Sequence, residues 1–228
     1  MFEPALDNPV HACLSTRHAH LALGSPLALR YPRDISPLAG LSGGTAAHVA
    51  ALEALVDVDD DVALAGPHVP ELSPRWAVFH ASEITQMVRS DTTRLPEHDL
   101  PVAPLDANDV PQMLALVERT QPGPFRRRTI ELGRFVGVRD GNRLVAMAGE
   151  RTWIGRFREV SGVCTDPSVQ RRGLARALIA RVVNRMLEAG ETPYLHVESA
   201  NERAIDLYLR LGFTRRTRFR LVAARRTR

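Results

Sequence analysis

Hydrophobic positions in the second half of the chain alternate between helical spacing and short continuous runs. Apolar residues recur every three or four positions in some stretches, which predicts helices over Ala107–Arg119, Gly173–Leu187 and Asn201–Leu211. Short apolar runs predict strands over Gly133–Val138, Arg143–Gly149, Glu159–Thr165, Tyr194–Val197 and Phe213–Ala223. This order predicts an α/β fold in which helices pack on a mixed central sheet.

Turn residues support these boundaries. Asp140 and Gly141 separate two apolar runs, which is a strong signal for a β-hairpin. Gly190 and Gly212 follow predicted helices at the position where a chain commonly turns left-handed to end a helix.

The first third of the chain is patterned more weakly and contains many prolines. It holds an apolar stretch at Leu21–Leu29, a helical stretch at Thr45–Val56 and a β-like run at Trp76–His80. A proline-containing junction, Leu95–Pro104, follows. We therefore predict an N-terminal region over residues 1–95 and a separate domain over residues 100–228.

Composition excludes several classes of protein. The 228 residues are 44% hydrophobic and 25% charged, as in a globular rather than a disordered chain. There is no apolar run of about 18 residues to predict a membrane span, and residues 1–14 lack the pattern of a secretory signal. Cys13 and Cys164 lie far apart without metal-ligand spacing, so we expect no disulfide framework, no metal site and a cytoplasmic location.

Charge is divided unevenly along the chain. Residues 1–100 contain 6 arginines against 13 acidic residues, whereas residues 101–228 contain 24 against 13, and lysine is absent. A GC-rich genome explains the preference for arginine but not its segregation. The basic half indicates an anionic partner, either a phosphate-bearing cofactor or nucleic acid.

A candidate phosphate-binding loop lies between a predicted strand and the predicted helix that begins at Gly173. Its residues are Gln170, Arg171, Arg172, Gly173, Leu174 and Ala175. Amide groups that open a helix bind anions, small residues allow close backbone approach, and arginines add cationic donors. An ordinary basic first turn would show the same residues, so this hexapeptide needs support from its surroundings.

The loop and its surroundings resemble the GNAT acetyltransferase superfamily. The segments Pro122–Phe125, Arg128–Thr129, Leu132–Gly133 and Ala148–Arg151 resemble in particular a bacterial subgroup related to the FR47-like proteins. The loop matches the pattern Gln/Arg-x-x-Gly-x-Gly/Ala, Glu159–Pro167 resembles the fourth strand of the family, and Asn201-x-x-Ala204-x-x-x-Tyr208-x-x-x-Gly212–Phe213 resembles its C-terminal signature. The resemblance covers roughly residues 100–220. Arg176 departs from the small or hydroxylated residue common at that position.

The resemblance implies a splayed central sheet that holds acetyl-CoA between Glu159–Thr165 and Tyr194–Val197. The pantetheine arm would bond to the backbone at Val163 and Thr165, with the Cys164 side chain pointing elsewhere. Asn201 would cap its helix and contact pantetheine, Ala204 would leave room for the cofactor, and Tyr208 would protonate the departing thiolate. The implied cofactor-binding set is Val163, Cys164, Thr165, Gln170, Arg171, Arg172, Gly173, Leu174, Ala175, Arg176, Asn201 and Ala204.

Removal of a proton from the acceptor amine has three candidate routes. Glu159 stands 14 residues before Gly173, a spacing that matches the catalytic glutamate of histone-type members of the superfamily. Glu150 ends the preceding predicted strand and is the second candidate. A water relay is the third, and either glutamate is equally well explained as a structural or substrate-orienting carboxylate.

The function that follows is direct transfer of an acetyl group from acetyl-CoA to a primary amine in a ternary complex, with an acceptor that the sequence does not identify. The alternatives are a catalytically silent acyl-CoA sensor and a module that binds nucleic acid or protein. Residues 215–228 contain 7 arginines, but their alternation with apolar residues indicates an amphipathic strand and argues against nucleic acid.

The regions outside these motifs carry weaker expectations. The N-terminal region is expected to be a degenerate GNAT-like half or a cap over the acceptor side, where its acidity would attract cationic amines. Pro122–Phe125 is either an acceptor-site wall or a plain loop. A homodimer is compatible with the family.

Overall fold

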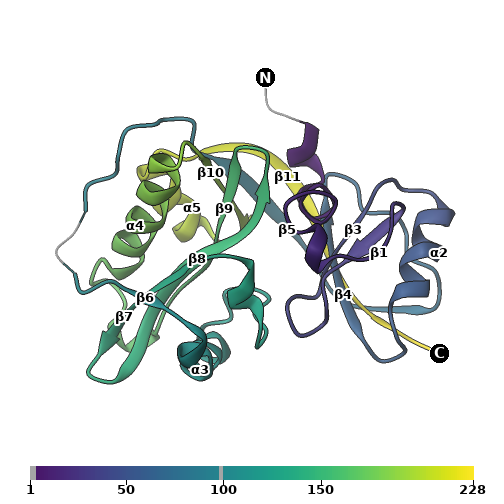
Figure 1. Ribbon diagram of the computed structural model, residues 1–228, viewed down its shortest axis with the longest axis horizontal. Helices are drawn as coiled ribbons and strands as arrows, with labels where there is room; N and C mark the ends of the chain where they lie inside the picture. Colours follow the sequence, from purple (N-terminus) through teal and green to yellow (C-terminus); the bar gives the residue numbers. More distant parts are fainter. Residues whose placement is uncertain (1–3, 98–99) are drawn as a thin grey trace.

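The computed structural model describes residues 4–97 and 100–228, and their strands form a continuous sheet (Figure 1). Residues 1–3 of the predicted N-terminal region and residues 98–99 of the predicted junction lie outside the described residues. The strand order across this eleven-stranded sheet is β1-β2-β3-β4-β11-β5-β10-β9-β8-β7-β6. The strands are β1 Leu23–Ser25, β2 Ala28–Arg30, β3 Leu38–Leu41, β4 Asp61–Gly66, β5 Trp76–Val88, β6 Ala103–Leu105, β7 Phe135–Asp140, β8 Arg143–Ile154, β9 Phe157–Thr165, β10 Thr192–Glu198 and β11 Thr214–Arg226.

Helices cover the sheet and connect its strands. The α-helices are α1 Pro9–Leu14, α2 Ala46–Leu55, α3 Val110–Thr120, α4 Leu174–Glu188 and α5 Glu202–Arg210. The 3-10 helices are η1 Pro4–Asp7, η2 Ala19–Leu21, η3 Ala107–Asp109, η4 Thr129–Leu132 and η5 Pro167–Val169. The helices predicted in the second half are confirmed within one to three residues at their ends, because their signals are local in the chain. The predicted hairpin is also confirmed, but its second strand, β8, continues five residues past the predicted end at Gly149.

In helix α4, the spacing of apolar residues was sufficient to predict the helix. Leu178, Val182 and Met186 recur along one stripe and are buried against the sheet, while Arg181 on the opposite side is half exposed. Burying such side chains stabilises the folded state by about 1.5–3 kcal/mol each. The helix ends at Ala189 and Gly190, where a positive φ of 72° is accessible to glycine at little cost.

Strands β5 and β11 form the connection between the two ends of the sheet. They pair antiparallel from Thr214–Val88 to Arg226–Trp76, and β11 also pairs with β4 over Arg220–Arg225. Figure 1 shows them running together from the α4 and α5 side toward β4 and α2. Strand β5 therefore lies between β11 and β10, among strands from the far end of the chain. The division at residues 95–100 stays a prediction.

The arginine-rich C-terminal segment forms the paired strand β11. Phe219, Val222 and Ala224 are buried, while Arg218 and Arg220 are exposed. The interpretation as an amphipathic strand is confirmed, since this segment pairs with strands on both sides. No helix among the described residues is long and apolar enough to cross a membrane.

Candidate active site

Strands β9 and β10 separate in the middle of the sheet. They pair in parallel only from Thr192–Phe157 to Tyr194–Glu159. Beyond Tyr194, β10 continues with β5 on its other side, while β9 continues with β8. The splay predicted between these strands is therefore present, and it leaves backbone groups of β9 facing an opening rather than a neighbouring strand.

A β-bulge lies in β9 where the opening begins. Ser161 pairs with Gly149 and Cys164 with Met147, so β9 contains one residue more than β8 across this interval. Gly162 adopts a φ of +62°, and a Cβ placed on it would lie 3.1 Å from the Phe135 ring. Glycine is thus required by both backbone conformation and space. The bulge interrupts the ladder and turns backbone groups toward the opening.

The opening leads into a cavity of about 690 Å³. Its walls come from the strands β3, β4, β5, β8, β9, β10 and β11, from the helices α1, α3 and α5, and from the loop that follows α3. Five of the predicted site residues line this cavity, namely Glu159, Val163, Asn201, Ala204 and Tyr208. The volume is in the range of binding sites for small ligands.

The predicted phosphate loop opens outward at the start of α4. Gly173 is the N-cap with a φ of 79°, and no side chain caps the helix there. A Cβ on Gly173 would meet nothing within 4 Å, so the space beside its backbone is open. Amides of a first helical turn have no partner within the helix and attract anions. Arg171, Arg172 and Arg176 are exposed around this turn.

Other members of the predicted loop have structural contacts. Leu174 is buried in the core, Ala175 is half-buried, and the Gln170 side-chain oxygen accepts a long 3.5 Å bond from Arg203 on α5. Arg171 itself has a φ of 66°, in the left-handed region that non-glycine residues rarely occupy. The chain therefore turns sharply just before the helix begins.

Helix α5 presents its predicted residues in the expected way. The Asn201 side chain accepts a 3.1 Å hydrogen bond from the Ala204 amide and so caps the helix. Tyr208 lies on the same face and is 8% exposed. Burial raises the pKa of its phenol to about 12. Among the described residues, none hydrogen-bonds to this hydroxyl, so it is a protonated donor available to the cavity.

Glu159 is held by a dense set of donors. Its carboxylate accepts bonds from Arg151 at 2.6 and 2.9 Å, from the Thr152 hydroxyl at 2.6 Å and from His196 Nδ1 at 2.8 Å. Burial alone would raise the pKa of Glu159, but the Arg151 charge and these hydrogen bonds outweigh it and hold the pKa well below its usual range. The carboxylate is therefore ionised and weakly basic.

His196 lines the cavity and was missed by the sequence reasoning. The Gln86 amide nitrogen donates to the Leu6 carbonyl and lies 3.0 Å from His196 Nε2, while the Gln86 oxygen accepts from Arg216. This arrangement makes Gln86 a donor to Nε2, so the ring proton sits on Nδ1 and points to Glu159. Only the packing of β5 beside β10 reveals these partners.

Glu150 occupies a different environment. It is 3% exposed and bonds to Arg158 at 2.9 Å and to Arg185 on α4. Its carboxylate also accepts a hydrogen bond from the backbone N–H of Arg134 at 3.3 Å. Glu150 does not lie among the residues that line the cavity, and these contacts connect α4 to the sheet.

At the end of β9, Val163, Cys164 and Thr165 have different surroundings. Val163 lines the cavity, whereas Cys164 packs in the core on the other side. Burial raises the pKa of the Cys164 thiol to about 11, so it is a neutral thiol at pH 7 and not an activated nucleophile. The Thr165 hydroxyl is buried without a hydrogen-bond partner.

The N-terminal region fastens the loop on the far side of the cavity. Arg126 pairs with Asp61 at 2.7 Å, Arg128 pairs with Asp34 at 3.1 Å, and the Thr129 hydroxyl donates to the Ile35 carbonyl at 2.6 Å. Pro122–Phe125, immediately before these contacts, lines the cavity. The N-terminal region therefore holds in place the loop that forms this wall.

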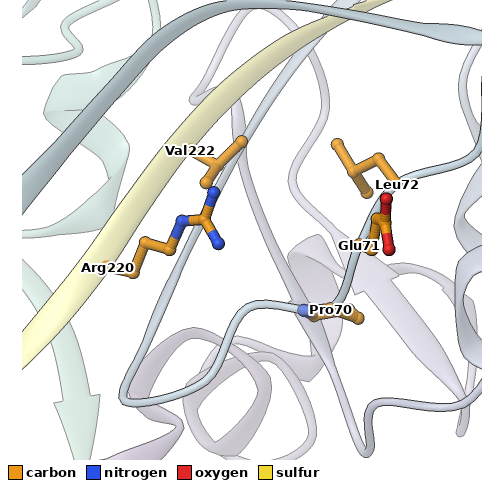
Figure 2. A pocket seen from close by; sticks show the side chains of 5 residues that line it. All are labelled: Pro70, Glu71, Leu72, Arg220 and Val222. Carbon is orange, nitrogen blue, oxygen red and sulfur yellow. The ribbon is translucent and has the colours of Figure 1, made fainter.

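A smaller hollow of about 300 Å³ lies on the other face of β11. Leu221 and Ala223 face the large cavity, whereas Arg220 and Val222 alternate with them and face this hollow. Figure 2 shows the Arg220 guanidinium pointing across it toward Pro70–Leu72. Five residues line it, and none of the predicted site residues is among them.

Comparison with known proteins agrees with this geometry. The family described as FR47-like protein matches residues 135–222. The N-alpha-acetyltransferase RimI of Mycobacterium tuberculosis is 31% identical over 136 residues, which span 58% of this chain and 78% of RimI. A structure assigned to the GNAT acetyltransferases, from Novosphingobium aromaticivorans, is 35% identical with a TM-score of 0.90 and covers 99% of this chain and 100% of its own.

The chain belongs to the GNAT family of N-acetyltransferases. This confirms the predicted fold class and the predicted enzyme class, an acyltransferase. The ribosomal protein bS18-alanine N-acetyltransferase of Escherichia coli is 25% identical over 122 residues, spanning 51% of this GNAT protein and 82% of its relative. A GCN5-related N-acetyltransferase from Kribbella flavida has the same fold over 96% of both chains, with 19% identity and a TM-score of 0.60.

Proposed function

We propose that this GNAT protein transfers an acetyl group from acetyl-CoA directly to a primary amine, with both substrates bound together. The observation that carries the proposal is the splay between β9 and β10, which opens into a cavity beside the unpartnered Tyr208 hydroxyl. Acetyl-CoA held in the splay and an amine held in the cavity would meet beside the Tyr208 hydroxyl. Bringing two reactants together in this way can lower a barrier by about 7–11 kcal/mol.

The donor would lie along the free edge of β9 and end at α4. Pantetheine amides would bond to backbone groups at Val163 and Thr165, as an added strand does. The diphosphate would sit at the opening of α4, beside Gly173, with the loop residues Gln170 to Arg176 around it. Asn201 and small Ala204 would flank the arm where it enters the cavity.

The chemical step forms a carbon–nitrogen bond and breaks the carbon–sulfur bond of the thioester. A neutral amine attacks the carbonyl carbon, and negative charge develops on the carbonyl oxygen. Backbone N–H groups exposed by the bulge at Gly162 would stabilise that charge. The Tyr208 hydroxyl would then donate its proton to the departing sulfur, which leaves as coenzyme A. The nitrogen would release a proton to solvent as the amide forms, and the phenol would regain one from solvent.

We propose that Glu159 acts by positioning rather than by accepting the proton itself. Its low pKa makes it a weak base, and its oxygens are already occupied by Arg151, Thr152 and His196. With His196 it would instead fix the point where β9 and β10 part. Glu150 as a proton acceptor stays a prediction, and its pairing with two arginines favours a structural role.

The acceptor class is a primary amine. The relatives from M. tuberculosis and E. coli are named for N-terminal and ribosomal-protein acetylation, so a protein N-terminus is one form of amine to be tested. We further propose that residues 1–95 contribute the acceptor wall, since Asp34, Ile35 and Asp61 hold the loop over Arg126–Thr129.

Thiol release from acetyl-CoA tests the proposal. Purified full-length protein is incubated with acetyl-CoA and a panel of amines that includes alkylamines, polyamines, amino acids and an alanine-initiated peptide, and coenzyme A is quantified with a thiol reagent. Amine-dependent release, with the acetylated amine found by mass spectrometry, supports transfer. Binding of acetyl-CoA without release for any amine would instead favour an acyl-CoA sensor.

A further inference from the structure

Three carboxylates line the cavity of this enzyme, and they differ in their partners. Asp61 is paired with Arg126 and Glu159 with Arg151. Glu198 has no arginine partner among the described residues. Its negative charge is therefore the one that remains available to a ligand in the cavity.

The position of Glu198 is set by the junction of two strands. It is the last residue of β10 and pairs with Ile84 of β5, just before the turn that leads into α5 and Tyr208. The Ser82 hydroxyl donates to its carboxylate at 3.1 Å, and His80 Nε2 lies 4.0 Å away. One hydroxyl donor orients the carboxylate while its side chain remains 46% exposed.

Phe79 also lines the cavity because of a second bulge. His80 pairs with Ala223 and Val78 with Ala224, so Phe79 has no partner on β11. In a regular strand, neighbours point to opposite faces, yet Phe79 and His80 both line the cavity. The ring is 57% exposed, and the Arg225 guanidinium carbon lies 5.8 Å from its centroid.

We propose that Glu198 binds the acceptor nitrogen and that Phe79 contacts an apolar group next to it, so that the acceptor is a primary amine with a hydrocarbon substituent. This rests on the proposed acetyl transfer and names its substrate class. An anionic oxygen and an exposed aromatic ring on adjoining strands match a cation attached to an apolar group.

The carboxylate would act at two stages of the reaction. It attracts the amine, which is an ammonium ion in solution at neutral pH. Before attack, the ammonium ion gives one proton through this carboxylate to solvent, which leaves a neutral amine. After that amine attacks the thioester, the nitrogen again carries a positive charge, and Glu198 stabilises it. The excess proton leaves the nitrogen through this exposed carboxylate to solvent, while sulfur leaves with the electron pair of the broken bond.

Kinetics of two variants and one control test the assignment. Steady-state rates are measured with 2-phenylethylamine, n-butylamine and methylamine for wild type, Glu198→Gln, Phe79→Ala and Glu83→Gln. Glu83 is the matched control, since it is exposed on β5 and bonded to Arg218 but is not among the residues that line the cavity. Calorimetric binding of coenzyme A and thermal unfolding are measured on each protein.

Glu198→Gln should lower kcat/KM by about 10- to 100-fold for each amine that wild type accepts, since one charge-assisted hydrogen bond is lost. Phe79→Ala should lower kcat/KM for 2-phenylethylamine by about tenfold and leave methylamine within about twofold. Coenzyme A affinity and melting temperature should match the control.

The outcomes separate this inference from the proposed function. Unchanged kinetics in Glu198→Gln, or a wild type that acetylates only amines without an apolar substituent, would overturn the acceptor assignment and leave acetyl transfer standing. No acetylation of any amine would overturn both. An equal loss in Glu83→Gln would show that bulk charge, not the cavity carboxylate, attracts the amine.

Discussion

The Tyr208 hydroxyl offers a direct test, since the structure separates its contribution to chemistry from its contribution to stability. The side chain is buried, its ring packs edge-on against Phe213 at 5.8 Å, and no described residue bonds to its oxygen. The change Tyr208→Phe keeps the ring and removes only the oxygen. The free energy of unfolding should therefore change by about 0.5 kcal/mol or less.

The expected loss lies in turnover. A hydrogen bond to a charged group, here the departing thiolate, contributes about 1.5–3 kcal/mol. Because each 1.36 kcal/mol corresponds to a factor of ten in rate, kcat should fall about 10- to 150-fold. The KM for acetyl-CoA should stay within about twofold, since the bond forms as the sulfur departs and contributes little to the bound thioester.

The assay is steady-state thiol release, paired with urea unfolding of the same samples. Burial raises the pKa of Tyr208 to about 12, so the wild-type hydroxyl should remain protonated and active up to at least pH 10. A Tyr208→Phe enzyme with wild-type kcat would refute the role of this hydroxyl. A variant that unfolds more readily by several kcal/mol would refute the claim that the oxygen has no structural partner.

Further predictions concern the bulge, the helix opening and a buried histidine. Gly162→Ala should lower kcat and the free energy of unfolding together, the latter by about 1–2 kcal/mol, because of its positive φ and the nearby Phe135 ring. Gly173→Ala should weaken coenzyme A binding about tenfold in calorimetry, whereas Gly190→Ala, with a similar φ and equally open surroundings, should not. Burial lowers the pKa of His18 to about 4, so stability should fall by up to about 3 kcal/mol as pH drops from 6.5 to 4. His18→Gln should flatten that part of the urea-unfolding pH profile, and an unaltered profile would contradict the shift.

The sign of the His18 effect follows from proton binding. The unfolded chain takes up a proton near pH 6.5, whereas the folded protein resists it until about pH 4. Stability contributed by the neutral ring is therefore present above pH 6.5 and is lost on acidification. Charged Arg158 nearby adds to the effect of burial.

Local signals in the sequence were sufficient for the helices, the hairpin and the helix-opening loop. The stripe of Leu178, Val182 and Met186 and the turn at Asp140–Gly141 act within a few residues, so short-range spacing determines the elements they form. The GNAT resemblance added that Glu159–Thr165 and Tyr194–Val197 are neighbouring strands that splay apart.

Other features depend on contacts between distant parts of the chain, and only the tertiary structure decided them. Spacing placed Glu159 near the site, but its basicity is set by Arg151 and His196, which reach it from neighbouring strands. The insertion of β5 beside β10 brings Ser82 to Glu198, 116 residues apart in the chain. Burial, charge pairing and bulge position are properties of the assembled sheet, so no local pattern encodes which carboxylate stays free to bind an amine.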